Sequence, residues 1–222
     1  MYVEFDIPKI SPEPDAFAQY WLRSFFIRPA STRYEINALA NTYVRLVSAA
    51  LVEYEEGDKC LKAVWETSDS FNLGALHRSI SHFEACIFNA NRATNCFRRL
   101  RGDRLHDPIA IALRQQRFLF AHDSIANRIR DMRNEIHHLE ESVLDGRVAR
   151  GQNFALRADG PEVSHPTEQN QTVKTIDRLV IGSHEISFRE LSQWLEEMMC
   201  AVSKITEVLP STSPPPLVPN DV

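Results

Sequence analysis

Residues 124–142 read SIANRIRDMRNEIHHLEES, and this stretch decides the fold that the sequence predicts. An α-helix turns by about 100° per residue, so the apolar side chains here fall in one arc. They are Ile125, Ile129, Met132, Ile136, Leu139 and, just beyond the stretch, Val143. Another part of the helix surface collects two arginines, an asparagine and two histidines: Arg130, Arg133, Asn134, His137 and His138. The sequence therefore predicts a helix with a core-facing side and a side rich in cations and titratable bases.

Helical spacing of apolar residues recurs along most of the chain. It predicts further helices over residues 16–27, 33–56, 73–100, 109–120 and 188–205. The first of these holds five aromatic residues and is expected to be heavily buried. Gly57 is expected to end the second helix, and Ser187 with Glu190 forms a capping box that begins the last.

Residues after Gly146 break this pattern. Two short β-like runs, 153–157 and 178–181, are separated by a polar stretch over 159–172. Gly182 and Ser183 form a tight-turn signal. We expect a small β-hairpin or ribbon with a long connection, inserted at about residues 150–183 before the last helix.

The predicted fold class is therefore all-α, a helical bundle with this small hairpin inserted. Residues 1–209 are expected to form a single domain, in which residues 1–12 are an extended lead-in. The Pro-rich residues 210–222 cannot bury a core and are expected to be a disordered tail.

Composition restricts the partners. The formal net charge is −5, so any contact with nucleic acid has to come from local basic patches. The chain offers no Gly-rich phosphate loop, and no cofactor is expected. No signal-like segment and no apolar run of 18 residues occurs, which predicts a cytoplasmic protein without a membrane partner. The cysteines show no C-x-x-C spacing and are expected to be reduced, buried thiols: Cys60, Cys86, Cys96 and Cys200.

One basic patch lies at the C-terminal end of the helix predicted over 73–100. It consists of Arg98, Arg99, Arg101 and Arg104. Cations at this position are favoured by the negative end of the helix dipole, which is a purely structural explanation. The same arginines also suit contact with an RNA backbone. Both interpretations stay open at this point.

A metal site has weak support. Glu135 and His138 form an E-x-x-H pair of the kind that binds di-iron centres in helical bundles. Such a site needs a second pair, and the other match, Glu162 to His165, lies in a Pro-rich loop. The helix predicted over 73–100 offers only Glu84 as a further ligand. No metal is therefore predicted, and the cysteine spacing does not suit zinc either.

Residues 133–138 have the form R-N-x-x-x-H, late on a helix within a bundle. This resembles the HEPN superfamily, whose signature is an Arg, four to six residues and then a His, often with a polar residue after the Arg. Arg133 and His138 match, with Asn134 in the polar slot. Arg130 and His137 also fit, with a six-residue gap, so the pair is not unique. The resemblance covers residues 31–142 as a bundle, and its motif is six residues long.

The resemblance implies a function. Many HEPN proteins are metal-independent endoribonucleases, commonly toxins or defence factors, that act as homodimers and in some cases pair with an antitoxin protein. Their motif helices meet across the dimer, and the ribose 2′-OH of RNA attacks the adjacent phosphate. By this resemblance Arg133 and His138 are catalytic with Asn134 in support, and Arg130 and His137 are auxiliary. Asn134 lies one turn before His138 and is expected to orient its ring.

Two alternatives remain. The adjacent histidines near a helix C-terminus can be a solvated, purely structural pair, because cations are favoured there. Some HEPN proteins are non-catalytic, so the same helix can serve a helical interaction or dimerisation module. Arg133 and His138 differ by about 140° around the helix, so they do not easily converge on one phosphate within one protomer, and a facing copy can complete the set.

Overall fold

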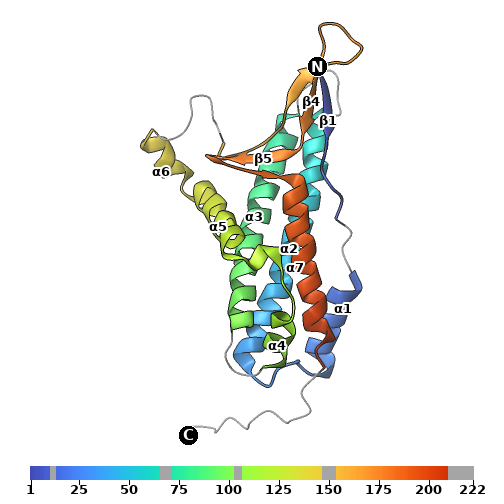
Figure 1. The fold of residues 1–222 in the computed structure, drawn as a ribbon, viewed down its shortest axis with the longest axis vertical. Helices are drawn as coiled ribbons and strands as arrows, with labels where there is room; N and C mark the ends of the chain where they lie inside the picture. The colour runs from blue at the N-terminus through green and yellow to red at the C-terminus, as the bar shows by residue number, and fades with distance from the viewer. Residues whose placement is uncertain (11–13, 66–71, 103–106, 147–153, 210–222) are drawn as a thin grey trace.

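The computed structural model describes residues 1–10, 14–65, 72–102, 107–146 and 154–209. Its centre is an antiparallel pair of long helices, α2 (Tyr34–Trp65) and α3 (Leu73–Gly102), which pack along their length (Figure 1). Buried aromatic rings join them at two levels. The ring centroids of Tyr43 and Phe97 lie 5.9 Å apart, and those of Tyr54 and Phe83 lie 6.2 Å apart. Burial of such large apolar side chains is the main favourable term in folding.

A third long helix, α7 (Phe188–Glu207), packs against α2 and completes the bundle. The hydroxyl of Tyr43 donates to the carbonyl of Met198, at 2.8 Å, so the polar tip of a buried ring is satisfied. The side chain of Ser187 accepts a hydrogen bond from the backbone N–H of Glu190, at 3.1 Å. This confirms the predicted cap of the last helix.

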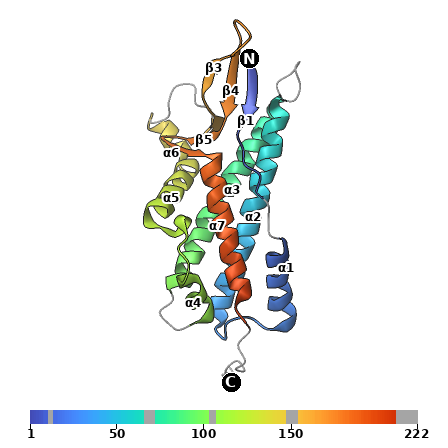
Figure 2. The same ribbon diagram turned by 45° about the vertical axis from the view of Figure 1, so that its right-hand side comes forward.

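Two shorter helices lie towards one end of the bundle. Helix α1 (Pro14–Leu22) packs beside α7, and α4 (Pro108–Arg114) contacts both α3 and α7 (Figures 1 and 2). A π-helical turn, η1 (Arg23–Ile27), follows α1, and a 3₁₀ turn, η2 (Leu119–Ala121), follows α4.

Two three-stranded sheets occupy the opposite end (Figure 2). The first has the order β1 (Tyr2–Phe5), β4 (Thr172–Ile176), β3 (Glu162–Ser164), with β1 parallel to β4. The second is antiparallel, in the order β2 (Leu156–Asp159), β5 (Arg178–Ile181), β6 (His184–Ser187).

The mostly helical architecture is confirmed, but the prediction of a small hairpin was wrong in extent. Strand β5 lies where the sequence predicted it, β3 falls within the stretch assigned to a polar connection, and β4 begins at the last residue of that stretch. The N-terminal lead-in supplies β1, which pairs with a strand some 170 residues away, as in Tyr2 opposite Val173. Parallel pairing at that distance leaves no local pattern to detect.

The helix α2 continues past Gly57, where the sequence predicted its end. A Cβ atom at this position would lie 2.9 Å from the ring of Phe83 on α3. The glycine therefore lets two helices approach closely instead of capping one. The Pro-rich tail, predicted over 210–222, lies outside the described residues.

The aromatic helix near the N-terminus is less buried than predicted. Tyr20 packs into the core, but Phe25 and Phe26 on η1 are 71% and 80% exposed. Cys86 is the buried thiol among the four cysteines, which are all free, while Cys200 is exposed. Among the described residues no helix has both the length and the apolar character to cross a membrane.

Candidate functional site

The sequence stretch that carries the HEPN-like motif forms two helices rather than one. Helix α5 (Asp123–His137) ends at His138, which has φ −103° and ψ 23°, and α6 (Leu139–Leu144) follows. The prediction of a continuous helix over 124–142 was therefore wrong at one residue. His-His contains neither Gly nor Pro, so local propensity carries no signal for this break.

Helix α5 leans outward from the bundle, with α6 at its far end (Figure 1). Its inner face is short, since only Ala126, Ile129 and Met132 are buried. Arg128 supplements this packing: its guanidinium donates to the carboxylate of Glu190 and to the carbonyl of Glu185. The helix is thus held by polar contacts as well as by apolar burial.

The C-terminal half of α5 rests on the turn between β5 and β6. The turn residue Gly182 has φ +54°, and a Cβ atom there would lie 2.2 Å from Oε1 of Glu135. Only a glycine fits both this backbone conformation and the approach of Glu135. The β-sheet insertion therefore helps to set the position of the motif helix.

Phe88 of α3 is the centre of the candidate site. The guanidinium carbon of Arg133 lies 5.1 Å from the centroid of its ring, a cation–π contact. The ring of His137 lies 6.2 Å from the same ring, at an angle of 74°. His138 extends the cluster outward, with its ring 4.9 Å from that of His137. The structure therefore brings Arg133, His137 and His138 together around one aromatic side chain.

Arg133 and His138 do not meet directly. Phe88 and His137 connect them, and within the described residues neither a hydrogen bond nor a ring contact joins the two side chains. Nδ1 of His138 lies 3.2 Å from Oε2 of Glu141. The imidazole thus has a carboxylate neighbour in its own chain.

Asn134 does not orient the ring of His138, contrary to the prediction. Its side-chain oxygen accepts a hydrogen bond from Nη1 of Arg133, at 3.1 Å, while its backbone oxygen accepts from the N–H of His138, at 2.9 Å. The side-chain amide of Asn134 therefore positions Arg133, its neighbour in the sequence, and not His138 one turn further along the helix.

The remaining predicted residues lie apart from this cluster. Arg130 is exposed and forms an ion pair with Asp131, at 3.0 Å. Arg98 pairs with Asp123 at the start of α5, and thus ties α3 to α5. Arg99 is exposed and Arg101 half-buried, whereas Arg104 lies outside the described residues. The three described arginines of the predicted RNA-binding patch thus have different surroundings.

The sequence pattern did not predict Phe88 as part of the site. The apolar stripe of α3 includes its neighbour Ile87, which is buried, and Phe88 lies beside that stripe and is only half-buried. A large aromatic residue next to the core face, opposite a helix rich in arginine and histidine, is the signal that points to it.

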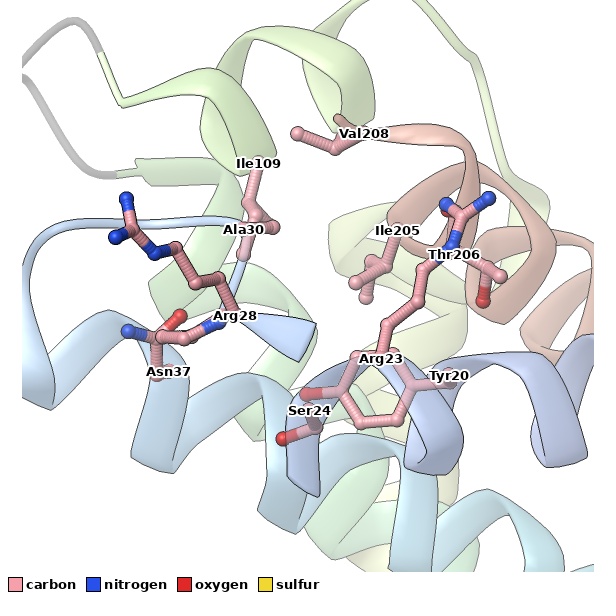
Figure 3. A pocket seen from close by; sticks show the side chains of 11 residues that line it. Tyr20, Arg23, Ser24, Arg28, Ala30, Asn37, Ile109, Ile205, Thr206 and Val208 are labelled. Carbon is pink, nitrogen blue, oxygen red and sulfur yellow. The ribbon is translucent and has the colours of Figure 1, made fainter. Parts of the chain in front are cut away.

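Two cavities lie away from this cluster. One lies between η1, α2 and the end of α7 (Figure 3), but it holds only about 20 Å³, and Arg23 reaches into it to donate to the carbonyl of Thr206. That volume suits a single water molecule. The other, of about 350 Å³, lies beside Tyr54 and Lys59 on α2. Neither cavity is lined by any of the predicted site residues.

Within the part of the chain that the structure describes, no three His, Cys, Asp or Glu side chains form a group that could hold a metal ion. Glu135 of the E-x-x-H pair instead packs over Gly182. Comparisons with protein-family models, with curated proteins and with solved structures found no match.

Proposed function

We propose that the protein is a metal-independent endoribonuclease of the HEPN type. The observation that carries the proposal is the cluster around Phe88, where a permanent cation and two imidazoles lie on an accessible edge of the molecule. His137 and His138 are exposed, so a large substrate can reach them. The HEPN-like signature formed by Arg133, Asn134 and His138 supports the same reaction.

The chemistry needs a base, an acid and a cation. A neutral imidazole accepts the proton of the ribose 2′-OH, whose oxygen attacks the adjacent phosphorus. The bond from phosphorus to the 5′-oxygen breaks, and a protonated imidazole supplies the proton that the leaving oxygen needs. Arg133 stabilises the negative charge that develops on the phosphoryl oxygens. Histidine suits both proton transfers because its ordinary pKa lies near neutrality.

A homodimer completes this site. Arg133 turns towards Phe88 while His138 turns towards Glu141, so one protomer presents the two groups in different directions. Val143 and Leu144 lie on α6, which directly follows His138, and Leu144 is 87% exposed. Apolar side chains of this size at an exposed helix end favour contact with another helix. Pairing of two such ends brings the Arg133 of one protomer near the His138 of its partner.

The proposed reaction predicts the products. Incubation of RNA with the purified protein in EDTA should yield fragments with 2′,3′-cyclic phosphate and 5′-hydroxyl ends. A matched oligonucleotide with a single 2′-deoxy residue at the cleaved position should stay intact, because it lacks the nucleophile. Cleavage of that oligonucleotide at the deoxy position, or products with 5′-phosphate ends, would contradict the proposal.

The predicted biological setting follows from the same resemblance. We propose that the enzyme acts as a toxin or a defence factor in the cytoplasm, with RNA as substrate and an antitoxin protein as its regulator. The exposed Arg99 and half-buried Arg101 are then available to the RNA backbone, since no described carboxylate pairs with either.

The alternative is a non-catalytic helical module that dimerises through the same face. The exposed Val143 and Leu144 favour it as much as they favour an enzyme, because both need a paired α6. The two functions differ in one result: the module forms a stable dimer and leaves RNA intact.

A further inference from the structure

The charges of the α2–α3 pair are divided between its two halves. Residues 36–52 of α2 contain one charged side chain, Arg45, and residues 85–102 of α3 contain four arginines and no acidic residue. The acidic residues of the two helices lie elsewhere, mostly in the half near the sheets: Glu35, Glu53, Glu55, Glu56, Asp58 and Glu84. One half of the hairpin therefore has a cationic surface, although the whole chain is acidic.

Three of these cations gather on one surface, and we call Arg45, Arg92 and Arg99 the arginine triad. The contact of Tyr43 with Phe97 sets the register of the antiparallel helices and places Arg45 opposite the turn of α3 that holds Arg92. Arg92 and Arg99 are two turns apart on the same side of α3. All three side chains are exposed.

Cys96 lies within this arrangement of cations. The thiol lies on α3 between Arg92 and Arg99 and is half-buried. Burial raises the pKa of this thiol, and the positive charges of all three triad residues oppose the rise. All three guanidinium groups are therefore near enough to act electrostatically on this thiol.

The arginine triad lacks acidic partners among the described residues. Other arginines of the same chain are neutralised, as Arg98 is by Asp123 and Arg128 is by Glu190. Like charges held together on a surface repel one another, and an anion that binds them relieves this repulsion. A group of unpaired arginines is thus suited to a polyanion, and the forked guanidinium matches phosphate oxygens.

We infer that the arginine triad binds the phosphate backbone of single-stranded RNA. The choice of RNA rests on the proposed function. Arg92 and Arg99 are about 10 Å apart along the helix, so the two side chains suit separate phosphates of one strand better than one small anion. Phe88 of the candidate site lies one turn before Arg92, on the same side of α3. The strand therefore runs from the triad along α3 to Arg133 and the histidines.

The test measures binding without cleavage. The full chain is titrated with a 2′-O-methyl oligoribonucleotide, which has no free 2′-OH, at several salt concentrations. Each phosphate contact contributes about 0.7 to the slope of log affinity against log salt for single strands. R92Q should therefore reduce the slope by about 0.7, and the triple variant R45Q/R92Q/R99Q by about 2. R78Q, at an exposed arginine near the other end of α3, is the matched control and should leave the slope unchanged.

Alkylation locates the bound strand. The oligonucleotide should protect Cys96 from a thiol reagent, while the equally half-buried Cys60, about 22 Å along α2 from Arg45, should react as before. Absence of binding, an unchanged slope in the triple variant, or equal alkylation of Cys96 with and without the oligonucleotide would overturn the inference.

The outcomes separate this inference from the proposed function. If the triad is needed for binding but the protein leaves RNA intact, the RNA-binding site is supported and the nuclease activity is contradicted. If the protein cleaves RNA but the triple variant has an unchanged salt slope, the nuclease activity is supported and the role of the triad in RNA binding is contradicted.

Discussion

Phe88 contacts both Arg133 and His137, so one side chain positions two members of the candidate site. At the scale of residues, the local surroundings decide which groups stabilise the fold and which weaken it. Glu84, one turn before Phe88, lowers the stability of the folded state when it is ionised, because its carboxyl is half-buried and burial raises its pKa.

Replacement of Glu84 by Gln should stabilise the protein at pH 7.5 and have little effect at pH 4. The folded-state pKa of Glu84 lies above the unfolded-state value, so ionisation at higher pH disfavours the folded state. Below the unfolded-state pKa both states are protonated and the difference disappears. Urea unfolding at the two pH values measures this effect.

E56Q is the control. The pKa of Glu56 is shifted in the opposite direction to that of Glu84, because a hydrogen bond from Lys59 lowers it. The E56Q variant should not stabilise the protein at pH 7.5. An E84Q variant that is no more stable than the wild type at pH 7.5 would contradict the assignment.

Gly57→Ala should destabilise the protein by about 1 kcal/mol. Alanine gains about 1 kcal/mol in helix propensity, but crowding in a packed core costs 1–3 kcal/mol. Here the new methyl group would meet the ring of Phe83 at 2.9 Å, and that ring is fixed between Tyr54 and Phe188. Chemical denaturation measures the change.

Gly74→Ala in α3 is the comparison, since a Cβ atom there meets its nearest neighbour at 3.5 Å, an ordinary contact. It should leave the free energy of unfolding unchanged or raise it. A Gly57→Ala protein as stable as the wild type would show that the two helices are not closely packed at this point.

At the scale of elements, α5 depends on its neighbours more than on its own buried face. It is held at its start by the pair of Arg98 and Asp123, in its middle by Arg128, and near its end by the approach of Glu135 to Gly182. These contacts come from α3, β6, α7 and the turn after β5, so the position of the candidate site depends on the sheets.

Gly182→Ala should loosen α5. The added Cβ would overlap the Glu135 carboxylate, and the positive φ disfavours alanine independently. Amide hydrogen exchange over residues 123–137 should become faster than in the wild type.

Gly146→Ala separates the effect of backbone strain from the effect of displacing Glu135. Gly146 also has a positive φ, of 67°, but a Cβ atom there meets nothing within 4 Å. Its substitution should strain the local backbone and leave exchange in α5 unchanged. Equal acceleration in both variants would mean that strain, rather than displacement of Glu135, is responsible.

Elements with strong local signals were predicted well. The apolar periodicity of α3 and α7, the Ser187 cap and strand β5 all follow from residues close in sequence. Two other features do not follow from nearby residues. The helix breaks at His138 without a Gly or Pro to signal it, and α2 continues through Gly57 because of a contact with α3. The motif residues of α5 were predicted, whereas Phe88 required the packing of α3 on α5.

At the scale of the whole molecule, the two sheets join distant parts of the chain. Strand β1 pairs with β4, and the hydroxyl of Tyr54 donates to the carbonyl of Pro8, at 2.9 Å, which holds the N-terminal segment on α2. Such contacts have no local pattern, so the sequence predicted the bundle and a small hairpin but not the two sheets at the end of the bundle. The candidate site lies on the helix that leans outward between these parts.

The activity proposed for the Arg/His cluster of α5 is cleavage of RNA without a metal. The most direct test incubates total RNA in EDTA with the wild type and with His138→Ala, after both proteins have been shown to have the same oligomeric state. Cleavage by the wild type and loss of at least 100-fold in the variant are expected, because removal of a general acid or base typically costs 10²–10⁴-fold. Intact RNA with the wild type, or equal cleavage by both proteins, would contradict the claim.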